Sequence, residues 1–510
     1  MRLRFAAALL LGFATASSIP AQTEKSSRES TPASPRLPGG VAGKPYNESL
    51  AGLQPAWSGW RATSEIPGLQ VEALGRVSGT PAREGLYFFL FTALDERKRP
   101  QRMQVLLGIS GELGQAKEQN RNSRRRSAVD ECKTLQAGVY ELRRNIGSDE
   151  SSVCLRLASG HVDLDLGGHT VRGRIVGKAI DLNGIEIAHG TLECNFADTD
   201  TDHGCLQLTG EQAAKTPLRV HDLTLRQLSN TGTGAARALH IDWSARTSGL
   251  PVTEPAVQIT SVTASVGPSK GDRSPILNVQ GSAITVEAAH NVLTCPTGSN
   301  ACQGIVCYGV HACWVHANRI VLEPNPMIDE TARAILFDQV KDRPDAFGEA
   351  WNNDVVANEG RAVRVRSSYN VWVHDNSVEP IANPAPNPHY IAAIHLGDPD
   401  SGTDDLKDTR VFRNFFQLGR GGTVIFARNT RDVLVENNVV LCSGCADATF
   451  AAVRNPLNPG EVSGLTLRNN IGRGIALSTW VEQSATLRIC NSGATTGEGK
   501  VERSPDCAPR

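Results

Sequence analysis

Tryptophan and histidine recur at a two-residue spacing in the C-terminal half of the chain, within short segments that favour β-strands. Trp314 precedes His316 by two positions, Trp372 precedes His374 in the same way, and Trp351 lies in the segment between them. Residues two apart on a strand point to the same side of a sheet. Indole rings stack on the apolar faces of sugar rings, and imidazoles hydrogen-bond to hydroxyl groups. We therefore predict that Trp314, His316, Trp351 and Trp372 bind a carbohydrate polymer.

A second set of side chains has the chemistry to act on an acidic sugar. Arg364 and Arg366 alternate in one β-prone segment, and Asp338 and His395 lie in the segments before and after it. Removal of the C5 proton of a uronate needs a base and a cation that neutralises the carboxylate. Arg364 or Arg366 can supply the cation, and His374 or His395 the base. Asp338 completes the candidate catalytic set, with a merely solvated charged face as the alternative.

The cysteines are a third chemical feature. The chain has 12 of them, an even number, and all follow the N-terminal apolar run. In an oxidising compartment disulfides are the default state. Zinc binding by Cys295, Cys302, Cys307 and Cys313 is the alternative, and we predict disulfides and no metal site. Near neighbours are expected to pair: Cys132 with Cys154, Cys194 with Cys205, and Cys490 with Cys507.

A sequence repeat positions these side chains. Each repeat has a turn residue that is preceded, three positions earlier, by an apolar residue. The turn residues are His169, Gly190, Leu223, Val262, Asn291, Asn318, Asn353, Asn376, Asn414, Asn438 and Asn470. Apolar residues alternate with other residues in front of each turn residue, which predicts one strand per repeat. A second family of apolar segments between the turns predicts at least one further sheet.

The last seven turn residues are all asparagine. If the repeats stack at the strand spacing of about 4.8 Å, these side chains lie above one another and their amides can form a ladder of hydrogen bonds. The sequence thus predicts an all-β chain with a parallel β-helix of about eleven coils over residues 132–482, followed by a C-terminal cap over residues 483–510.

This organisation resembles the right-handed parallel β-helix superfamily of pectate lyases, polygalacturonases and alginate-modifying enzymes. Residues 162–171 (VDLDLGGHTV) are similar to the first full coil of such chains. The resemblance implies the fold and a polysaccharide partner, but no single reaction. Residues 368–376 resemble the pectate lyase strand whose Asp helps to bind calcium, but here His374 takes that position and Asp375 lies at the turn. Calcium prefers oxygen ligands, and a histidine at this position offers none. The family resemblance allows a calcium ion, but no motif in this sequence supports one, so the cofactor is unknown.

Four segments precede the repeat. Residues 1–21 have the order of a secretory signal peptide, and residues 22–36 have the composition of a disordered tether. Residues 37–110 alternate β-prone runs with Gly and Pro, and through the turn at 77–81 (VSGTP) they resemble the Ig-like, cadherin-related repeat of bacterial surface proteins. That resemblance implies a small β-sandwich spacer. Residues 111–131 are a linker. As an alternative to binding a carbohydrate, Trp314, Trp351 and Trp372 could pack beneath a loop or beneath this module.

Bulk charge excludes one class of partner. Lys plus Arg, at 52, nearly equals Asp plus Glu, at 53, so the basic excess of nucleic-acid-binding proteins is missing. No later apolar run is long enough for a transmembrane helix. We expect a secreted or periplasmic protein whose partner is a polysaccharide or a cell-surface glycan, with the oligomeric state open. Two functions remain: a lyase, epimerase or hydrolase acting on an acidic polysaccharide, and a non-catalytic surface, adhesive or structural protein.

Overall fold

The computed structural model describes residues 37–503 apart from these gaps: 51–52, 55, 63–66, 112–125, 197–201, 231–234, 246, 251–253, 269–273, 297–301, 324–331, 342–344, 358–360, 382–391, 398–405, 419–421, 443–448, 454–463, 474–476, 482–485, 491–493 and 498–499. The predicted signal peptide, the tether, most of the linker and Cys507 lie outside the described residues.

The described residues form strands and no α-helix. One sheet, here called sheet 1, takes a single strand from each turn of the chain, and its 14 strands pair in parallel in chain order. Its strands are β9 (Lys133–Leu135), β11 (Val153–Leu157), β14 (Arg174–Gly177), β16 (Asp202–Gly210), β18 (Ala235–Trp243), β21 (Ser274–Gln280), β24 (Cys302–Tyr308), β27 (Arg333–Asp338), β30 (Arg361–Arg366), β34 (Ala392–Leu396), β38 (Thr423–Ala427), β41 (Thr449–Val453), β44 (Ser478–Val481) and β46 (Ala494–Gly497).

The other long sheet, sheet 2, takes two strands from most turns, in two parallel rows that meet at a bend. The first row is β12 (Val162–Asp165), β15 (Glu186–Phe196), β17 (Leu218–Asn230), β19 (Val257–Thr260), β22 (Thr285–Ala289), β25 (Ala312–His316), β28 (Phe347–Trp351), β32 (Val371–His374), β36 (Arg410–Phe412), β39 (Leu434–Glu436), β42 (Leu465–Arg468) and β45 (Thr486–Cys490). The second row is β13 (Thr170–Arg172), β20 (Thr263–Val266), β23 (Val292–Cys295), β26 (Arg319–Leu322), β29 (Asp354–Ala357), β33 (Ser377–Ile381), β37 (Phe415–Leu418), β40 (Val439–Cys442) and β43 (Ile471–Arg473).

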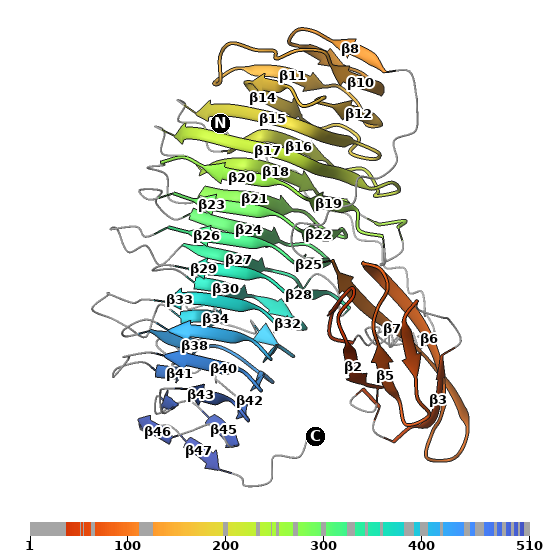
Figure 1. The fold of residues 1–510 in the computed structure, drawn as a ribbon, viewed down its shortest axis with the longest axis vertical. Helices are drawn as coiled ribbons and strands as arrows, with labels where there is room; N and C mark the ends of the chain where they lie inside the picture. Colours follow the sequence, from red (N-terminus) through yellow and green to blue (C-terminus); the bar gives the residue numbers. More distant parts are fainter. Residues whose placement is uncertain are drawn as a thin grey trace, which may run out of the picture.

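Both long sheets run the length of one stack (Figure 1). Short strands complete it at β8 (Ser127–Val129), β10 (Gly138–Leu142), β31 (Ser368–Tyr369), β35 (Leu406–Lys407) and β47 (Lys500–Arg503). The inward side chains of both sheets form one continuous apolar core that extends from Val129 to Ile489. Stacked parallel strands around such a core are consistent with the predicted parallel β-helix.

The asparagine ladder is confirmed. Asn318 Nδ2 donates to Asn353 Oδ1 at 2.9 Å and to the backbone oxygen of Ala288 at 2.9 Å. The same two bonds repeat at each step from Asn291 to Asn438. The residue before each of these asparagines has a φ between 52° and 58°, a left-handed conformation that turns the chain at the bend. Because the buried amides are satisfied, the bend is held in one register.

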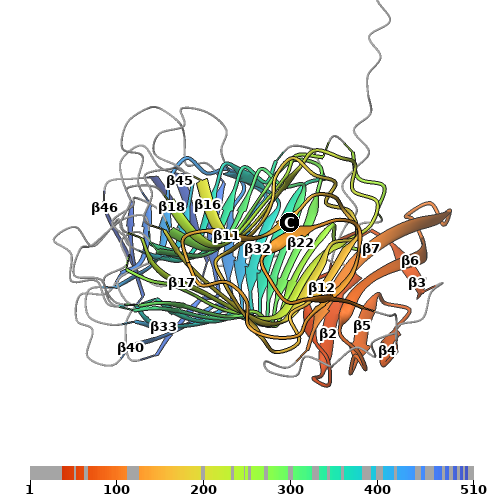
Figure 2. The same cartoon turned by 90° about the horizontal axis from the view of Figure 1, so that it is seen from above.

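A smaller body precedes the stack, and we call residues 37–111 the N-terminal module. Its four-stranded sheet consists of β1 (Gly40–Val41), β7 (Pro100–Ser110), β6 (Gly85–Leu94) and β3 (Ser58–Ala62), and its three-stranded sheet of β2 (Tyr46–Ser49), β5 (Arg76–Gly79) and β4 (Leu69–Val71). The module has its own apolar core around Trp60, Phe91 and Leu107. Seen along the stack, it lies beside β22 and β32 of sheet 2 (Figure 2).

Four disulfides join cysteines of the described residues, and none of those cysteines is free. The predicted pairs Cys132–Cys154 and Cys194–Cys205 are confirmed. The set that offered zinc ligands instead forms Cys295–Cys302 and Cys307–Cys313. Such bonds fit an oxidising compartment. In the described part of the chain, no helix reaches the length and apolarity needed to cross a membrane.

Candidate functional site

Arginine and histidine side chains gather on the outer face of sheet 1, where β27, β30, β34 and β38 are neighbours. Strand pairing places Arg361 opposite Arg333, and Arg364 opposite His395. His395 in turn lies opposite Phe426 of β38. These pairings bring residues from four successive turns of the chain onto one surface.

A break in the strand alternation explains how the outer arginines join this surface. In β27 the consecutive residues Ala334 and Ile335 both pack into the core, as do Ala362 and Val363 in β30. Two inward residues in succession shift the period-two pattern by one position. Arg333 therefore comes to the same face as Leu336, one strand from Arg361 and Arg364.

The guanidinium groups around His395 are buried. Arg333 is 3% exposed, Arg361 2%, Arg364 9% and Arg428 6%, and His395 itself is 1% exposed. Four cations on one buried surface lower the stability of any further positive charge there. An anionic ligand would be attracted for the same reason.

His395 is electrically unusual. Burial, together with the charges of Arg361, Arg364, Arg428 and Arg333, holds its pKa well below the ordinary value of 6.5. Its imidazole is therefore neutral at pH 7. Among the residues that the structure describes, neither ring nitrogen has a hydrogen-bond partner, and the ring packs edge-on against Phe426 at 4.8 Å between centroids. A neutral imidazole has a free electron pair that can accept a hydrogen bond from a ligand, and it can take up a proton where an anion offsets the surrounding positive charge.

Asp338 and Arg366 lie beside this cluster on the same face. They are opposite one another in the pairing of β27 with β30, and Arg366 Nε is 3.7 Å from Asp338 Oδ1. Asp338 is the only carboxylate within the four strands β27, β30, β34 and β38. The structure thus brings together four predicted catalytic residues: Asp338, Arg364, Arg366 and His395.

The fifth predicted catalytic residue, His374, is on a different sheet. It lies in β32 of sheet 2, within a row of rings that crosses β25, β28, β32 and β36. His316, Trp351, His374 and Phe412 follow one another with centroid separations of 4.2, 6.3 and 4.7 Å and nearly parallel planes. The predicted tryptophans share this face: Trp351 lies in the row and Trp314 packs with it in one apolar cluster. His374 therefore does not meet the His395 cluster.

The predicted carbohydrate-binding residues project from the outer face of sheet 2 but are covered. Trp314 and Trp351 have no exposed surface, His316 is 4% exposed and Trp372 is 6% exposed. Trp351 Nε1 donates to the backbone oxygen of Gly40 in the N-terminal module at 3.4 Å. Trp372 instead lies under Arg410, whose guanidinium is 5.3 Å from the ring centre. In this arrangement no polymer can stack on these rings, and for Trp351 the alternative of packing beneath the module applies.

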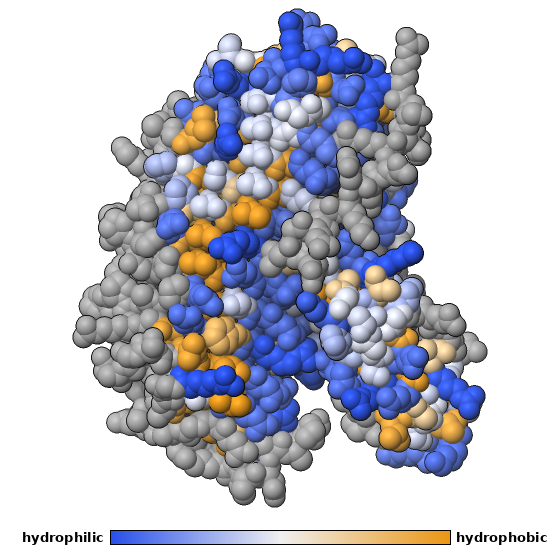
Figure 3. All heavy atoms as spheres, in the orientation of Figure 1, coloured by the Kyte–Doolittle hydropathy of each residue, from blue (hydrophilic) through white to orange (hydrophobic). Residues whose placement is uncertain are grey.

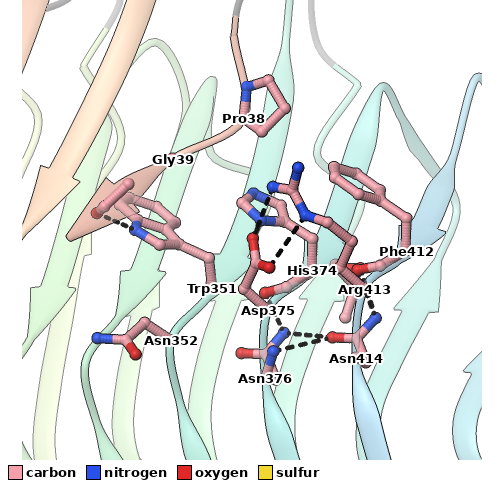
Figure 4. A network of polar contacts seen from close by, with 12 residues as sticks. Pro38, Gly39, Trp351, Asn352, His374, Asp375, Asn376, Phe412, Arg413 and Asn414 are labelled. Carbon is pink, nitrogen blue, oxygen red and sulfur yellow. Dashed lines mark hydrogen bonds and ion pairs between the residues drawn. The ribbon is translucent and has the colours of Figure 1, made fainter. Parts of the chain in front are cut away.

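A network of alternating charges joins the module to this face (Figure 4). His374 Nε2 is 2.9 Å from Glu349 Oε1 and its Nδ1 is 2.6 Å from Asp375 Oδ2. Arg413 binds both oxygens of Asp375, at 3.0 and 2.7 Å, and also pairs with Glu48 of the module. The backbone nitrogen of Gly39 donates to Glu349 Oε1 at 3.2 Å.

The charges in this network are balanced. Burial acts against a charged His374, but its hydrogen bonds to Asp375 and Glu349, with their negative charges, outweigh burial and raise its pKa. The pKa of Asp375 is lowered, because His374 and Arg413 outweigh the effect of burial. Each ring nitrogen of His374 has a partner, which is typical of a structural contact rather than of a reactive group.

Sequence reasoning missed Arg333, Arg361, Arg428 and Phe426. One signal was available, because β27 and β30 both begin with Arg-Ala followed by apolar residues, at the same distance from Asp338 and Arg366. Their shared position in the repeat would have placed Arg333 and Arg361 in one column.

Figure 3 shows where the module stands relative to the stack. The module meets the middle of the stack and its far end stands clear of the lower turns. Hydrophilic residues border the notch between them, and apolar residues lie along the stack.

Comparison with family models, with curated proteins and with solved structures found no match to this chain.

Proposed function

We propose that this chain is a secreted enzyme that binds an acidic polysaccharide on the outer face of sheet 1 and removes a C5 proton from a uronate, as a lyase or an epimerase does. The observation that carries the proposal is the neutral His395 surrounded by four arginines. Because these side chains are between 1% and 9% exposed, binding requires that a polymer gain access to a surface that is covered in this structure. The disulfides support export to an oxidising compartment. We infer that the stack is a right-handed β-helix of the pectate-lyase type and that the module is Ig-like.

The chemistry follows from the charges. A guanidinium binds a carboxylate through two parallel hydrogen bonds, and neutralising the uronate carboxylate makes its C5 proton easier to remove. The bound carboxylate also offsets part of the positive charge of the arginines, which otherwise opposes protonation of His395, and His395 accepts that proton. In a lyase the C5–H electrons form a C4=C5 double bond, the C4–O4 bond breaks, and the leaving oxygen takes up a proton. In an epimerase C5 is reprotonated from the other side.

Hydrolysis fits this face less well. Glycoside hydrolases use two carboxyl groups on either side of the scissile bond. The four strands of the cluster contain one carboxylate, Asp338, and it is paired with Arg366. These four strands therefore do not provide the second carboxyl group that hydrolysis needs.

The test is an assay of the mature protein on a panel of polyuronates and neutral polysaccharides, with and without calcium. It follows the ultraviolet absorbance of unsaturated products, the configuration at C5, and retention of the polymer. Turnover restricted to a polyuronate is expected. The absence of both turnover and retention on every acidic polymer would refute the proposal. Retention without turnover would favour a non-catalytic glycan-binding protein.

One variant and one control assign the base. His395→Gln should lower turnover by about 10²–10⁴-fold, the usual contribution of a general base, while retention of the polymer persists. His240→Gln is the matched control, because His240 is also a buried histidine on the outer face of sheet 1 but pairs with Asn278. Equal activity of His395→Gln and the control would exclude His395 as the base.

A further inference from the structure

Three side chains converge near the start of the stack, far along the chain from the His395 cluster. His189 lies in β15, and His221 and Asp222 lie in β17, the next strand of sheet 2. One ligand-type atom from each lies within 4.8 Å of the other two. His189 Nε2 is 3.6 Å from Asp222 Oδ2, and His221 Nδ1 is 2.8 Å from the same oxygen.

Backbone geometry at the bend creates this convergence. His189 and Asp222 each have a left-handed φ, of 59° and 51°, and each is the residue just before a turn position. That conformation takes the side chain out of the strict alternation of the strand. Asp222 can therefore reach both its neighbour His221 and His189 on the adjacent strand.

The outer nitrogens of both histidines face carboxylates. His189 Nδ1 is 3.4 Å from Asp165 Oδ1, and His221 Nε2 is 3.3 Å from Glu186 Oε1. Histidines that bind metals usually hold a carboxylate or carbonyl at the nitrogen that does not touch the metal, which fixes the tautomer and the orientation of the ring. Glu186 makes this hydrogen bond to His221, whereas Asp165 lies within ion-pair distance of His189 without a hydrogen bond to it and also pairs with Arg126. The other two ring nitrogens face Asp222.

We propose that His189, His221 and Asp222 bind one divalent cation of the zinc class, with Asp165 and Glu186 orienting the two imidazoles. Two nitrogens and one oxygen suit zinc and similar borderline ions better than calcium or magnesium. Metal–ligand bonds of 2.0–2.2 Å in tetrahedral geometry place ligand atoms about 3.4 Å apart. His189 Nε2 and Asp222 Oδ2, at 3.6 Å, are close to this separation. A small rotation of His221, whose side chain is 22% exposed, would bring its nitrogen into the same arrangement.

The cation would fasten two successive turns of the stack at their bends. This part of sheet 2 precedes the asparagine ladder, whose first rung is Asn291. Its turn positions are Gly190 and Leu223, which have no side-chain amide that could hydrogen-bond to the next turn. A metal bridge between β15 and β17 would supply a cross-strand link where the ladder does not.

The test uses the full mature chain, freed of metal with a chelator and titrated with zinc chloride alone by calorimetry. One zinc per chain is expected. Glu186→Gln should weaken zinc binding about 10–100-fold through the loss of an orienting carboxylate, a change that an ordinary surface ion pair would not produce. The double variant His189→Ala/His221→Ala should lose saturable binding.

His169→Ala is the control, since His169 lies at the preceding bend and outside the cluster; it should bind zinc normally. Circular dichroism checks that each variant is folded, and Asp222→Asn replaces the double variant if that one is misfolded. Absence of saturable zinc binding in the wild type, or binding unchanged in the double variant, would overturn the proposal and leave the cluster as a surface ion-pair network.

Discussion

Two outer faces of the same turns carry buried histidines with opposite surroundings. On sheet 2, His374 lies between Glu349 and Asp375, and further charges alternate in sign as far as Glu48 of the module. On sheet 1, His395 is surrounded by four cations and has no hydrogen-bond partner among the described residues. A balanced network stabilises an interface, whereas like charges held together work against folding. The difference indicates that this face of sheet 2 supports the module, whereas the surface around His395 is the one for which we propose an anionic ligand.

The largest difference should appear when each histidine is replaced by glutamine. His374→Gln leaves Glu349 buried without its cation, and breaking a buried pair in this way costs about 3–5 kcal/mol. His395→Gln removes no ionic partner, so its free energy of unfolding should change by less than about 1 kcal/mol. Chemical denaturation of both variants measures this, and equal destabilisation would break the comparison.

Neutralising one arginine should have contrary effects on binding and stability. Arg361 lies directly opposite Arg333, and like charges at such a position are unfavourable by up to about 1 kcal/mol. Arg361→Gln should therefore unfold at a slightly higher temperature while its KM for a polyuronate rises about tenfold or more, the loss of one charged hydrogen bond. Arg413→Gln is the counterpart on sheet 2 and should lower the unfolding temperature. An Arg361→Gln protein that is both less stable and unchanged in KM would contradict the assignment.

The two histidines should give the stability curve opposite slopes on either side of pH 6.5. The folded-state pKa of His374 is raised, so its contribution is complete below about pH 6.5 and is lost as pH rises through the folded-state value. The pKa of His395 is lowered, so below about pH 6.5 the unfolded chain binds a proton that the folded chain does not. The free energy of unfolding therefore decreases as pH is lowered below about 6.5.

Unfolding temperatures measured from about pH 4 to pH 9 separate these slopes. His374→Gln should flatten the alkaline side and His395→Gln the acidic side. Activity should persist below pH 6.5, because His395 stays neutral there, and an acidic limit at or above pH 6.5 would contradict the lowered pKa.

The smallest effect is expected at the covered tryptophans. Trp372 is 6% exposed and lies under Arg410, so Trp372→Ala should leave polymer retention unchanged in a protein that remains folded. Retention is compared with that of Arg361→Gln on the same column. Loss of retention in Trp372→Ala would mean that Arg410 moves off the ring and that Trp372 becomes accessible to the polymer.

The fold was predictable because it repeats. One asparagine per turn and one apolar residue three positions earlier are local features, and the ladder at Asn291 to Asn470 follows from their alignment. Likewise Arg364 and His395 could be placed on neighbouring strands from their positions in the repeat. Arg333 and Arg361 were missed because two successive inward residues shift the strand pattern.

The repeat could not predict which outward side chains of the stack are buried by the N-terminal module. Trp351 and His374 project outward as predicted, but their burial depends on where a separate body of the chain comes to rest. That contact joins residues far apart in sequence, such as Gly39 and Glu349, through single hydrogen bonds that leave no repeated signature. An outward aromatic residue therefore has the same sequence signal whether it meets a ligand or the chain's own module.

The asparagine ladder also has a direction. From Asn291 to Asn438, each side-chain nitrogen donates to the side-chain oxygen of the asparagine in the next turn and to a backbone oxygen of the preceding turn. The side-chain to side-chain bonds therefore all run toward the C-terminal end of the stack. A turn that carries its own asparagine can be inserted or deleted as a unit without disturbing the rest, because each rung contacts only its neighbours. Replacement of one internal asparagine would instead interrupt the ladder at that rung, while the backbone pairing of both sheets and the apolar core continue across it. Such a protein can change length over generations by whole turns and not by fractions of one.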